Sequence, residues 1–355
     1  MIKIAYIINS IRKNGPTNVL INMLKGLDYS RYKPTVITLI DEDDEKMIED
    51  IRKQAISVIQ LKMGKNFVTM FKTSLLRKIV DENEFDIIHT HSHIPTIMAQ
   101  NLNVKKITTV HCRLKEDFCD TYGKIKGNII NLFYITALKK YNKVVSCSKS
   151  TNDIVCKKIM NSTYIRNGID FSHEKNTHEI RKNLNIPNDA IVYMYAGILN
   201  NRKNVIKMLE TFSNNLKENE YLIILGSGIL EEQVKKYESK NIKILGFKNN
   251  VADYMNISNV YVSFSLSEGF PISVIEALSQ NMLLLLSDIP SHKEFFTMDK
   301  SKYIGEYFNE NNFLEKLSKI RKKINSKVLS RYMQQKYLSS SAMMKEYEKE
   351  YNSIL

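Results

Sequence analysis

The 355-residue sequence lacks the features that mark several specialised classes of protein. It has only four cysteines and no CxxC pair, which predicts reduced thiols and argues against a disulfide framework or a zinc site. No stretch reaches the roughly 18–20 apolar residues that a membrane-spanning helix needs. The segment 1–9 is too short for a secretory signal peptide and has no cleavage site, so we expect it to form a buried strand. These absences predict a cytoplasmic globular protein.

The first half of the chain has far fewer acidic than basic residues. Residues 1–172 contain 27 Lys and Arg against 17 Asp and Glu (+10), and residues 173–355 contain 25 against 21 (+4), which gives the net charge of +14. A basic half indicates an anionic partner, such as a membrane surface or an anionic acceptor, unless the lysines serve solubility alone. Nucleic acid is the least favoured partner, because the sequence contains no nucleic-acid-binding motif.

Sequence repeats and low-complexity segments are also missing, and short apolar runs alternate with helical patterns from the start of the chain. Two successive strand–helix series are typical of two doubly wound parallel sheets, so we predict an α/β protein with two domains. The hydrophilic stretch 172–185 separates the two series. The expected strands are 3–9, 35–39, 86–89, 106–110, 143–147, 191–196, 221–225, 242–245, 260–264 and 282–286.

The end of the chain predicts a helix that packs on the rest of the protein. Met343, Tyr347, Tyr351 and Leu355 recur at steps of four, so they share one face of a helix. An apolar face of this length is expected to be buried.

The most informative motif begins where the strand 260–264 is expected to end. Glu268 and Gly269 follow it, Pro271 opens a helical pattern, and that helix carries Glu276. Proline suits a first helical position, and glycine lets the backbone come close to a ligand. Amide groups at a helix start attract anions, whereas carboxylates suit hydroxyl groups. The combination predicts a ligand with hydroxyls beside its phosphates, such as a sugar nucleotide.

The block 260–278, continued by 287–294, resembles the donor site of retaining glycosyltransferases with the GT-B fold, specifically glycosyltransferase family four. The resemblance implies two Rossmann-like domains that face a central cleft. It places an acceptor-side domain at 1–166, a donor-binding domain at 167–330, and a closing helix within 331–355 that crosses back onto the first domain.

The resemblance also assigns roles to the two glutamates of the motif. In the family the first glutamate holds hydroxyls of the transferred sugar and the second holds the nucleotide ribose, which would be the roles of Glu268 and Glu276. Gly269, Phe270 and Pro271 would line the donor between them. The alternative is that both carboxylates are solvated surface groups.

In the family, a lysine and an arginine side chain bind the donor diphosphate. Lys203 matches the family lysine, but Ile198 occupies the position of its arginine. Arg202 is expected to replace that arginine, because a guanidinium can reach phosphate from a neighbouring position. The alternative for Lys203 is a solvated lysine at a helix start. Such cations would neutralise charge on the leaving diphosphate.

Three further residues are assigned to the donor through strand-end turns. Gly15 matches a glycine that faces the donor phosphates, and Gly246 with Phe247 would lie near the base. For each of them an ordinary tight turn is the alternative.

The seven histidines divide into three groups. His111 matches a family histidine that lines the sugar pocket between the domains, with a satisfied core histidine as the alternative. His89, His91 and His93 alternate after a strand, so we expect them on one face of an extended chain. We expect no metal there, because no Asp, Glu or Cys follows to complete a site, and the family works without metal. We expect His173, His178 and His292 to be surface or structural residues.

The resemblance implies a retaining, metal-independent glycosyltransferase of the hexosyltransferase type. It would move a sugar from a nucleotide-diphosphate sugar, which we expect to be UDP-linked, to an acceptor hydroxyl, with His111, Lys203 and Glu268 as catalytic residues. The acceptor would be a glycan, a lipid-linked or a teichoic acceptor of bacterial surface polysaccharide, teichoic-acid or glycolipid assembly, and no cofactor is expected. Two alternatives stay open on the same architecture: a non-catalytic sugar-binding or partner subunit, and a sugar-nucleotide epimerase or phosphorylase.

Two basic amphipathic segments of the first domain suit an anionic membrane surface. The segment 62–80 sets Phe67 and Phe71 among lysines, and the segment 122–143 does the same with Ile129 and Phe133. Core-facing helices with lysines on their outer side have the same pattern. Peripheral attachment at the inner face of the cell membrane is therefore one of two expectations, beside plain solubility.

Overall fold

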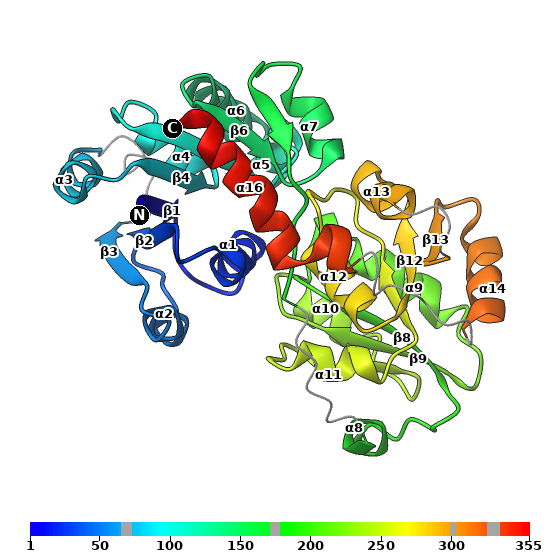
Figure 1. Cartoon of the computed structure of the whole chain (residues 1–355). Coiled ribbons are helices and arrows are strands. Elements are labelled where there is room, and N and C mark those ends of the chain that lie inside the picture. Colours follow the sequence, from blue (N-terminus) through cyan, green and yellow to red (C-terminus); the bar gives the residue numbers. More distant parts are fainter. Residues whose placement is uncertain (65–72, 171–177, 299–302, 325–333) are drawn as a thin grey trace. The chain divides into compact units, whose positions relative to one another are not determined.

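The computed structural model describes residues 1–64, 73–170, 178–298, 303–324 and 334–355. The chain divides into two compact units (Figure 1). Unit 1 consists of Met1–Asp170 and Tyr337–Leu355, and unit 2 consists of Phe171–Lys336. The division after Asp170 lies close to the boundary that the sequence predicts after residue 166.

Unit 1 is built on a seven-stranded sheet with the order β3-β2-β1-β4-β5-β6-β7, in which every pairing is parallel. The strand order reverses at β1, so the sheet is doubly wound as expected. Only β3 and the short β7 were not among the expected strands. The strands are β1 (Ile2–Ile8), β2 (Tyr32–Ile40), β3 (Ser57–Met63), β4 (Ile87–His91), β5 (Lys105–Val110), β6 (Lys143–Ser146) and β7 (Ser162–Tyr164).

Helices connect the strands of unit 1, and their apolar faces pack against the sheet. The α1 helix begins after Asn14, whose side chain accepts a hydrogen bond from the Thr17 amide and so satisfies one free N–H of the first turn. The helices are α1 (Gly15–Gly26), α2 (Glu45–Arg52), α3 (Ser74–Asn83), α4 (His93–Ala99), α5 (Lys115–Tyr122), α6 (Lys124–Leu138), α7 (Lys149–Val155) and α16 (Ser340–Ile354), which follows the π-helical turn η3 (Gln334–Leu338).

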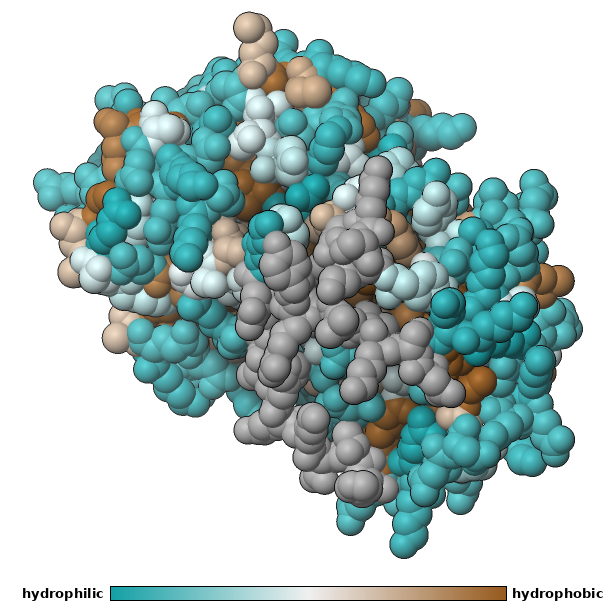
Figure 2. All heavy atoms as spheres, turned by 45° about the vertical axis from the view of Figure 1, so that its right-hand side comes forward, coloured by the Kyte–Doolittle hydropathy of each residue, from teal (hydrophilic) through white to brown (hydrophobic). Residues whose placement is uncertain are grey.

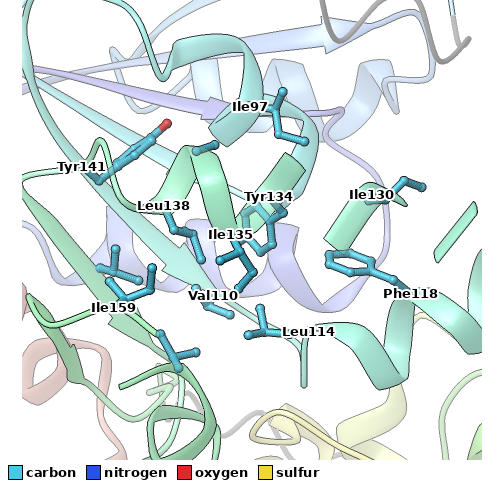
Figure 3. Packing of buried hydrophobic residues seen from close by; sticks show 13 residues of the cluster. Ile97, Val110, Leu114, Phe118, Ile130, Tyr134, Ile135, Leu138, Tyr141 and Ile159 are labelled. Carbon is cyan, nitrogen blue, oxygen red and sulfur yellow. The ribbon is translucent and has the colours of Figure 1, made fainter. Parts of the chain in front are cut away.

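One core of unit 1 lies beneath α6 (Figure 3). Ile130, Tyr134 and Ile135 of α6 pack with Val110 at the end of β5 and with Ile97 of α4. These buried side chains fix the inner face of α6 against the sheet, because each apolar group that leaves water stabilises the packed state.

The α16 helix belongs to unit 1, as the family resemblance implies. Met343, Tyr347 and Tyr351 are buried. The Tyr351 hydroxyl lies 2.8 Å from Nδ1 of His89 in β4. Leu355 was expected on the same face and is exposed instead, because α16 ends at Ile354, which is the buried residue.

Unit 2 contains a six-stranded parallel sheet with the order β10-β9-β8-β11-β12-β13. The order reverses at β8, and only β13 was not expected. The strands are β8 (Ile191–Ala196), β9 (Glu220–Leu225), β10 (Ile242–Ile244), β11 (Val260–Ser263), β12 (Leu283–Ser287) and β13 (Gly305–Phe308). The helices are α8 (His178–Asn183), the 3-10 turn η2 (Asn201–Lys203), α9 (Val205–Ser213), α10 (Glu231–Lys235), α11 (Val251–Asn256), α12 (Ile272–Ser279), α13 (Pro290–Met298) and α14 (Phe313–Lys323).

Hydrophilic side chains cover most of the face shown in Figure 2, and hydrophobic ones lie there in small separate patches. Within the described residues, no helix is both long enough and apolar enough to span a membrane.

Candidate functional site

The candidate site of unit 2 lies at the carboxyl ends of β8 and β11, which are neighbours in the sheet. The strand order reverses at this pair, and open α/β sheets bind their ligands at such a reversal. Two loops meet there. One runs from β8 into η2 and carries Arg202 and Lys203, and the other runs from β11 into α12 and carries Glu268.

Glu268 is the centre of the polar contacts in this site. Its carboxylate is buried and pairs with the ammonium group of Lys203, and Nη1 of Arg202 lies 3.1 Å from its Oε2. The Ser265 hydroxyl donates to Oε1 at 2.7 Å. Arg202 also donates to the Ser267 carbonyl oxygen at 2.6 Å, which ties the two loops together. The sequence therefore identified three residues that the fold brings into direct contact.

Electrostatics keep Glu268 ionised. Burial by itself would raise the pKa of this carboxyl group, but the charges of Lys203 and Arg202 outweigh burial and lower its pKa to about 2. Two cations against one carboxylate leave one positive charge in excess. This arrangement favours an anionic ligand while offering carboxylate oxygens to hydroxyl groups.

The second carboxylate of the motif, Glu276, lies on α12. Burial raises its pKa, and among the described residues its carboxylate has no hydrogen-bond or ion-pair partner. Both Glu276 and Glu268 act electrostatically on the hydroxyl of Tyr261, so both lie near that ring. The Tyr261 hydroxyl lies 2.9 Å from the Ala196 carbonyl oxygen and 2.8 Å from the Ser273 hydroxyl, and so links the end of β8 to α12.

The turn after β9 packs tightly against the turn after β8. A Cβ atom on Gly226 would lie 1.8 Å from the Gly197 carbonyl oxygen, and one on Gly228 would lie 2.3 Å from that of Leu199. Gly226 also has a φ of 140°, which residues with a side chain rarely adopt. These two glycines are thus required by the packing of the turns.

The structure shows where three further residues assigned to the donor lie. The Phe270 ring is buried and stacks on Phe295 of α13 with 4.3 Å between ring centroids, so this side chain belongs to the packed interior of unit 2. Pro271 was expected at the first helical position, but it is the cap residue, and α12 begins at Ile272. Phe247, next to Gly246, is half exposed.

His292 is a polar residue of this site that sequence reasoning missed. It was expected to be a surface or structural residue, and the structure places it in the interior of unit 2 near Glu268. Its Nδ1 lies 3.0 Å from the Ser287 carbonyl oxygen, and the Ser287 hydroxyl donates to the Ser265 carbonyl oxygen at 2.6 Å. Burial lowers the pKa of His292 to about 4, so the ring is neutral. The sequence signal that could have identified His292 was its position about one turn after the end of β12, the strand that pairs with β11.

A surface hollow of about 480 Å³ lies elsewhere in unit 2. Its lining includes Lys217, just before β9, and Ser239, just before β10. It therefore lies at the amino ends of these strands, on the edge of the sheet opposite the Glu268 site.

In unit 1, the ends of β4 and β5 bring three histidines together. Nε2 of His111 lies 3.0 Å from Nδ1 of His91, and the His91 ring stacks on that of His89 at 4.5 Å between centroids. Burial lowers the pKa of His111 to about 4 and those of His89 and His91 well below the ordinary value. All three are therefore neutral near pH 7.

The expectation that His93 shares a strand face with His89 and His91 is wrong. The strand β4 ends at His91, Ser92 has a φ of 78°, and His93 is the first residue of α4. The His93 ring packs edge-on against Phe118 at 5.1 Å between centroids. His111 from the neighbouring strand is the third member of the stack instead.

Gly15 is the first residue of α1. A Cβ atom added there would meet nothing within 4 Å, so packing does not require a glycine. Its role beside donor phosphates stays a prediction.

Within the described residues, no group of three or more His, Cys, Asp or Glu side chains is arranged to hold a metal ion.

Comparison with known proteins assigns this architecture to a family. Residues 13–173 match the family described as Glycosyltransferase Family 4, and residues 176–336 match Glycosyl transferases group 1. The chain is 26% identical over 377 residues to the O-antigen biosynthesis glycosyltransferase WclY of Escherichia coli, with 99% of this chain and 98% of the relative covered.

Two further proteins are similar to the chain. The UDP-Gal:alpha-D-GlcNAc-diphosphoundecaprenol alpha-1,3-galactosyltransferase of Escherichia coli is 23% identical over 296 residues, which cover 77% of this chain and 76% of the relative. The crystal structure of Anabaena Alr3699/HepE in complex with UDP matches with a TM-score of 0.79 at 16% identity and covers 99% of this chain and 100% of that one. The chain therefore belongs to the family-four glycosyltransferases and has their GT-B fold.

Proposed function

We propose that the protein transfers a sugar from a UDP-linked donor to an acceptor hydroxyl in the assembly of a bacterial surface polysaccharide, with retention of the anomeric configuration. The observation that carries the proposal is the contact of Glu268 with Arg202 and Lys203 at the strand reversal of unit 2. The names of the relatives support the remaining parts. WclY is an O-antigen biosynthesis glycosyltransferase, the galactosyltransferase is named for UDP-Gal, and HepE was crystallised with UDP.

In this proposal, Lys203 and Arg202 bind the diphosphate of the donor. Both cations now rest on Glu268, and the excess positive charge of the cluster would be matched by the incoming phosphates. As the bond to the anomeric carbon breaks, negative charge grows on the leaving diphosphate, and the two cations stabilise it. Arg202 thereby takes the place of the family arginine that is missing at Ile198.

The carboxylates bind the hydroxyl groups of the same ligand. Glu268 accepts hydrogen bonds from the transferred sugar, and Glu276, which lacks a partner among the described residues, accepts from the ribose. The backbone of Gly269 and Phe270 and the turn at Gly246 and Phe247 complete the donor site.

His111 is the catalytic candidate of unit 1 in this proposal. Its ring is neutral, because burial lowers its pKa to about 4, so it can exchange a hydrogen bond with a sugar hydroxyl without adding charge. His91 Nδ1, 3.0 Å away, fixes the orientation of the His111 ring.

Retention is proposed to follow from attack on the face that the diphosphate leaves. An enzyme carboxylate that attacked the anomeric carbon would form a covalent intermediate. Glu268 is held by two cations and a hydroxyl, which lowers its capacity as a nucleophile. The leaving phosphate would instead guide the acceptor hydroxyl to the same face, with a transition state of oxocarbenium character.

A thermal-shift panel tests the donor assignment. UDP-glucose, UDP-galactose and UDP-N-acetylglucosamine are compared with GDP-mannose, and a ligand at 100 times its dissociation constant is expected to stabilise the protein by about 2.7 kcal/mol. Stabilisation by the GDP-sugar alone would contradict a UDP donor. Turnover is also expected to persist in EDTA, and its loss in EDTA with recovery on adding manganese would contradict metal independence.

A non-catalytic sugar-binding subunit is the second candidate, and Ile198 at the arginine position favours it. Hydrolysis of the donor separates the two functions. A catalyst releases UDP slowly from a UDP-sugar when no acceptor is present, whereas a binding subunit is stabilised by the donor and releases nothing.

A cytoplasmic location at the membrane surface also belongs to the proposed function.

A further inference from the structure

Helix α6 of unit 1 is apolar on both of its faces. Its inner face packs into the core through Ile130, Tyr134 and Ile135 (Figure 3). Its outer face carries Ile125, which is 79% exposed, and Leu132, which is 65% exposed. The outer face of a surface helix is normally polar, so this one calls for a physical explanation.

The exposed residues form one continuous stripe, which we call the α6 stripe: Ile125, Ile129 and Leu132. They are spaced by four and three residues, so they follow one side of the helix. Single exposed apolar residues are common on proteins, but a contiguous stripe marks a contact with another molecule or a membrane.

The segment that carries the α6 stripe is charged with one sign along the sequence. Residues 121–152 contain no Asp or Glu. Lys124 and Lys126 are exposed in the first turn of α6, and Lys139 is exposed directly after its last residue. Within the described part of the chain, none of these three lysines has an ion-pair partner. An apolar stripe with uncompensated cations at both ends matches the acyl and headgroup layers of an anionic bilayer.

We propose that the α6 stripe docks the protein on an anionic lipid membrane. The aliphatic side chains enter the boundary between headgroups and acyl chains, and the three lysines contact the lipid phosphates. A second copy of the chain is a poorer occupant, because pairing two such stripes would bring like charges together. The other segment expected at a membrane, 62–80, includes residues 65–72, which lie outside the described residues, whereas Leu76 and Val80 are buried in unit 1.

Vesicle flotation with matched serine variants tests the stripe. Ile125→Ser combined with Leu132→Ser removes its two most exposed residues. The control combines Ile229→Ser and Leu314→Ser in unit 2, which are 81% and 60% exposed. The full chain is mixed with vesicles of equal parts phosphatidylglycerol and phosphatidylcholine, or of phosphatidylcholine alone. Wild type and control should float with the anionic vesicles only, and the α6 variant should bind at least about tenfold more weakly.

The lysines are tested separately, because they should act through charge. Lys124→Gln with Lys126→Gln should weaken binding about fivefold per lysine at low salt, and the difference from wild type should shrink in high salt. Lys236→Gln with Lys240→Gln, exposed in unit 2, is the control. Unfolding temperatures and donor hydrolysis without vesicles should match wild type in all variants, which separates docking from folding and from catalysis.

Three results would overturn the proposal. Wild type could bind neutral and anionic vesicles equally or bind neither. The control variants could lose as much binding as the α6 variants. Sedimentation without lipid could show a wild-type dimer that the Ile125→Ser, Leu132→Ser variant lacks, which would assign the stripe to a second copy of the chain.

Discussion

Units 1 and 2 share one kind of doubly wound parallel sheet but gather different side chains at the carboxyl ends of their central strands. In unit 2, the ends of β8 and β11 carry a carboxylate held by two cations. In unit 1, the ends of β4 and β5 carry the stack of His89, His91 and His111. The first cluster keeps its charges when buried because they compensate one another, whereas the histidines lose theirs because burial disfavours the imidazolium.

This difference indicates what each edge can bind. An ionic cluster with one excess positive charge suits a diphosphate, and its carboxylate suits the hydroxyls of a sugar. Neutral imidazoles can donate and accept hydrogen bonds without attracting charge, which suits an uncharged hydroxyl. The same scaffold thus holds two kinds of polar cluster near the carboxyl ends of its central strands.

Acid should destabilise unit 1 more than unit 2, and this is the largest effect we expect. The pKa values of His89, His91, His93 and His111 in the folded protein lie below the ordinary value of 6.5. Between the two values the unfolded chain binds more protons, so stability is present above pH 6.5 and is lost as the pH falls toward 4. In that window, each such histidine lowers the free energy of unfolding by about 1.4 kcal/mol for each unit by which the pH falls.

Hydrogen exchange at pH 7 and pH 5, corrected for intrinsic rates, measures this difference in stability between the two units. Unit 1 should lose more protection than unit 2, where His292 is the shifted histidine among the described residues and Glu268 stays ionised because its pKa is about 2. His93→Phe, which keeps the ring against Phe118, should reduce the loss. Equal loss in both units would show that the histidines do not control acid stability.

Removal of a cation from the Glu268 cluster should lower turnover. Lys203→Ala and Arg202→Ala should each lower turnover at least about tenfold, which corresponds to about 1.4 kcal/mol of transition-state stabilisation. Lys207→Ala, an exposed change on α9, is the control and should retain activity. Wild-type kinetics in the Arg202 variant would leave the arginine missing at Ile198 without a replacement.

Glu276→Ala should weaken the binding of free UDP by about tenfold, because one hydrogen bond from the ribose to a carboxylate is lost. Calorimetry with UDP measures the change, and unfolding temperatures verify the fold. Glu238→Ala, exposed in unit 2, is the control. Unchanged affinity for UDP in the Glu276 variant would contradict the ribose assignment.

Gly15→Ala should have the smallest effect on stability. The added methyl group meets no atom within 4 Å, so the free energy of unfolding should change by less than about 1 kcal/mol. Turnover should fall a few-fold if donor phosphates approach this turn, and unchanged turnover would remove Gly15 from the donor site. Gly226→Ala is the contrast, since its methyl group would lie 1.8 Å from a carbonyl oxygen and should destabilise unit 2.

Much of the fold follows from patterns that are local in the sequence. Apolar runs of strand length, such as 191–196 and 260–264, predicted β8 and β11 because buried parallel strands are nearly continuous in apolar residues. The parallel sheets followed from the alternation of such runs with helical patterns, and the closing helix followed from apolar residues at steps of four. The strand β3 was missed because its residues Ser57, Gln60 and Lys62 interrupt the apolar pattern.

The contacts within the site could be predicted only in part. The glycine, proline and carboxylates of the motif named Glu268 and Glu276, but that Arg202 and Lys203 rest on Glu268 depends on the pairing of β8 with β11, which is a long-range contact. His292 reaches the same cluster through β12, so its sequence neighbours gave little sign of its role. His93 was misplaced because a single residue, Ser92, changes the direction of the backbone.

The return of α16 to unit 1 has a consequence for the order in which the protein can fold during synthesis. Domains generally fold one after another as the chain leaves the ribosome, beginning with the first. Unit 1 cannot follow that order, because Tyr347 and Tyr351, whose hydroxyls contact Thr109 and His89, are made after the whole of unit 2. We therefore expect unit 2 to reach its final structure first. Until α16 is synthesised, the earlier part of unit 1 lacks the tyrosines that cover His89.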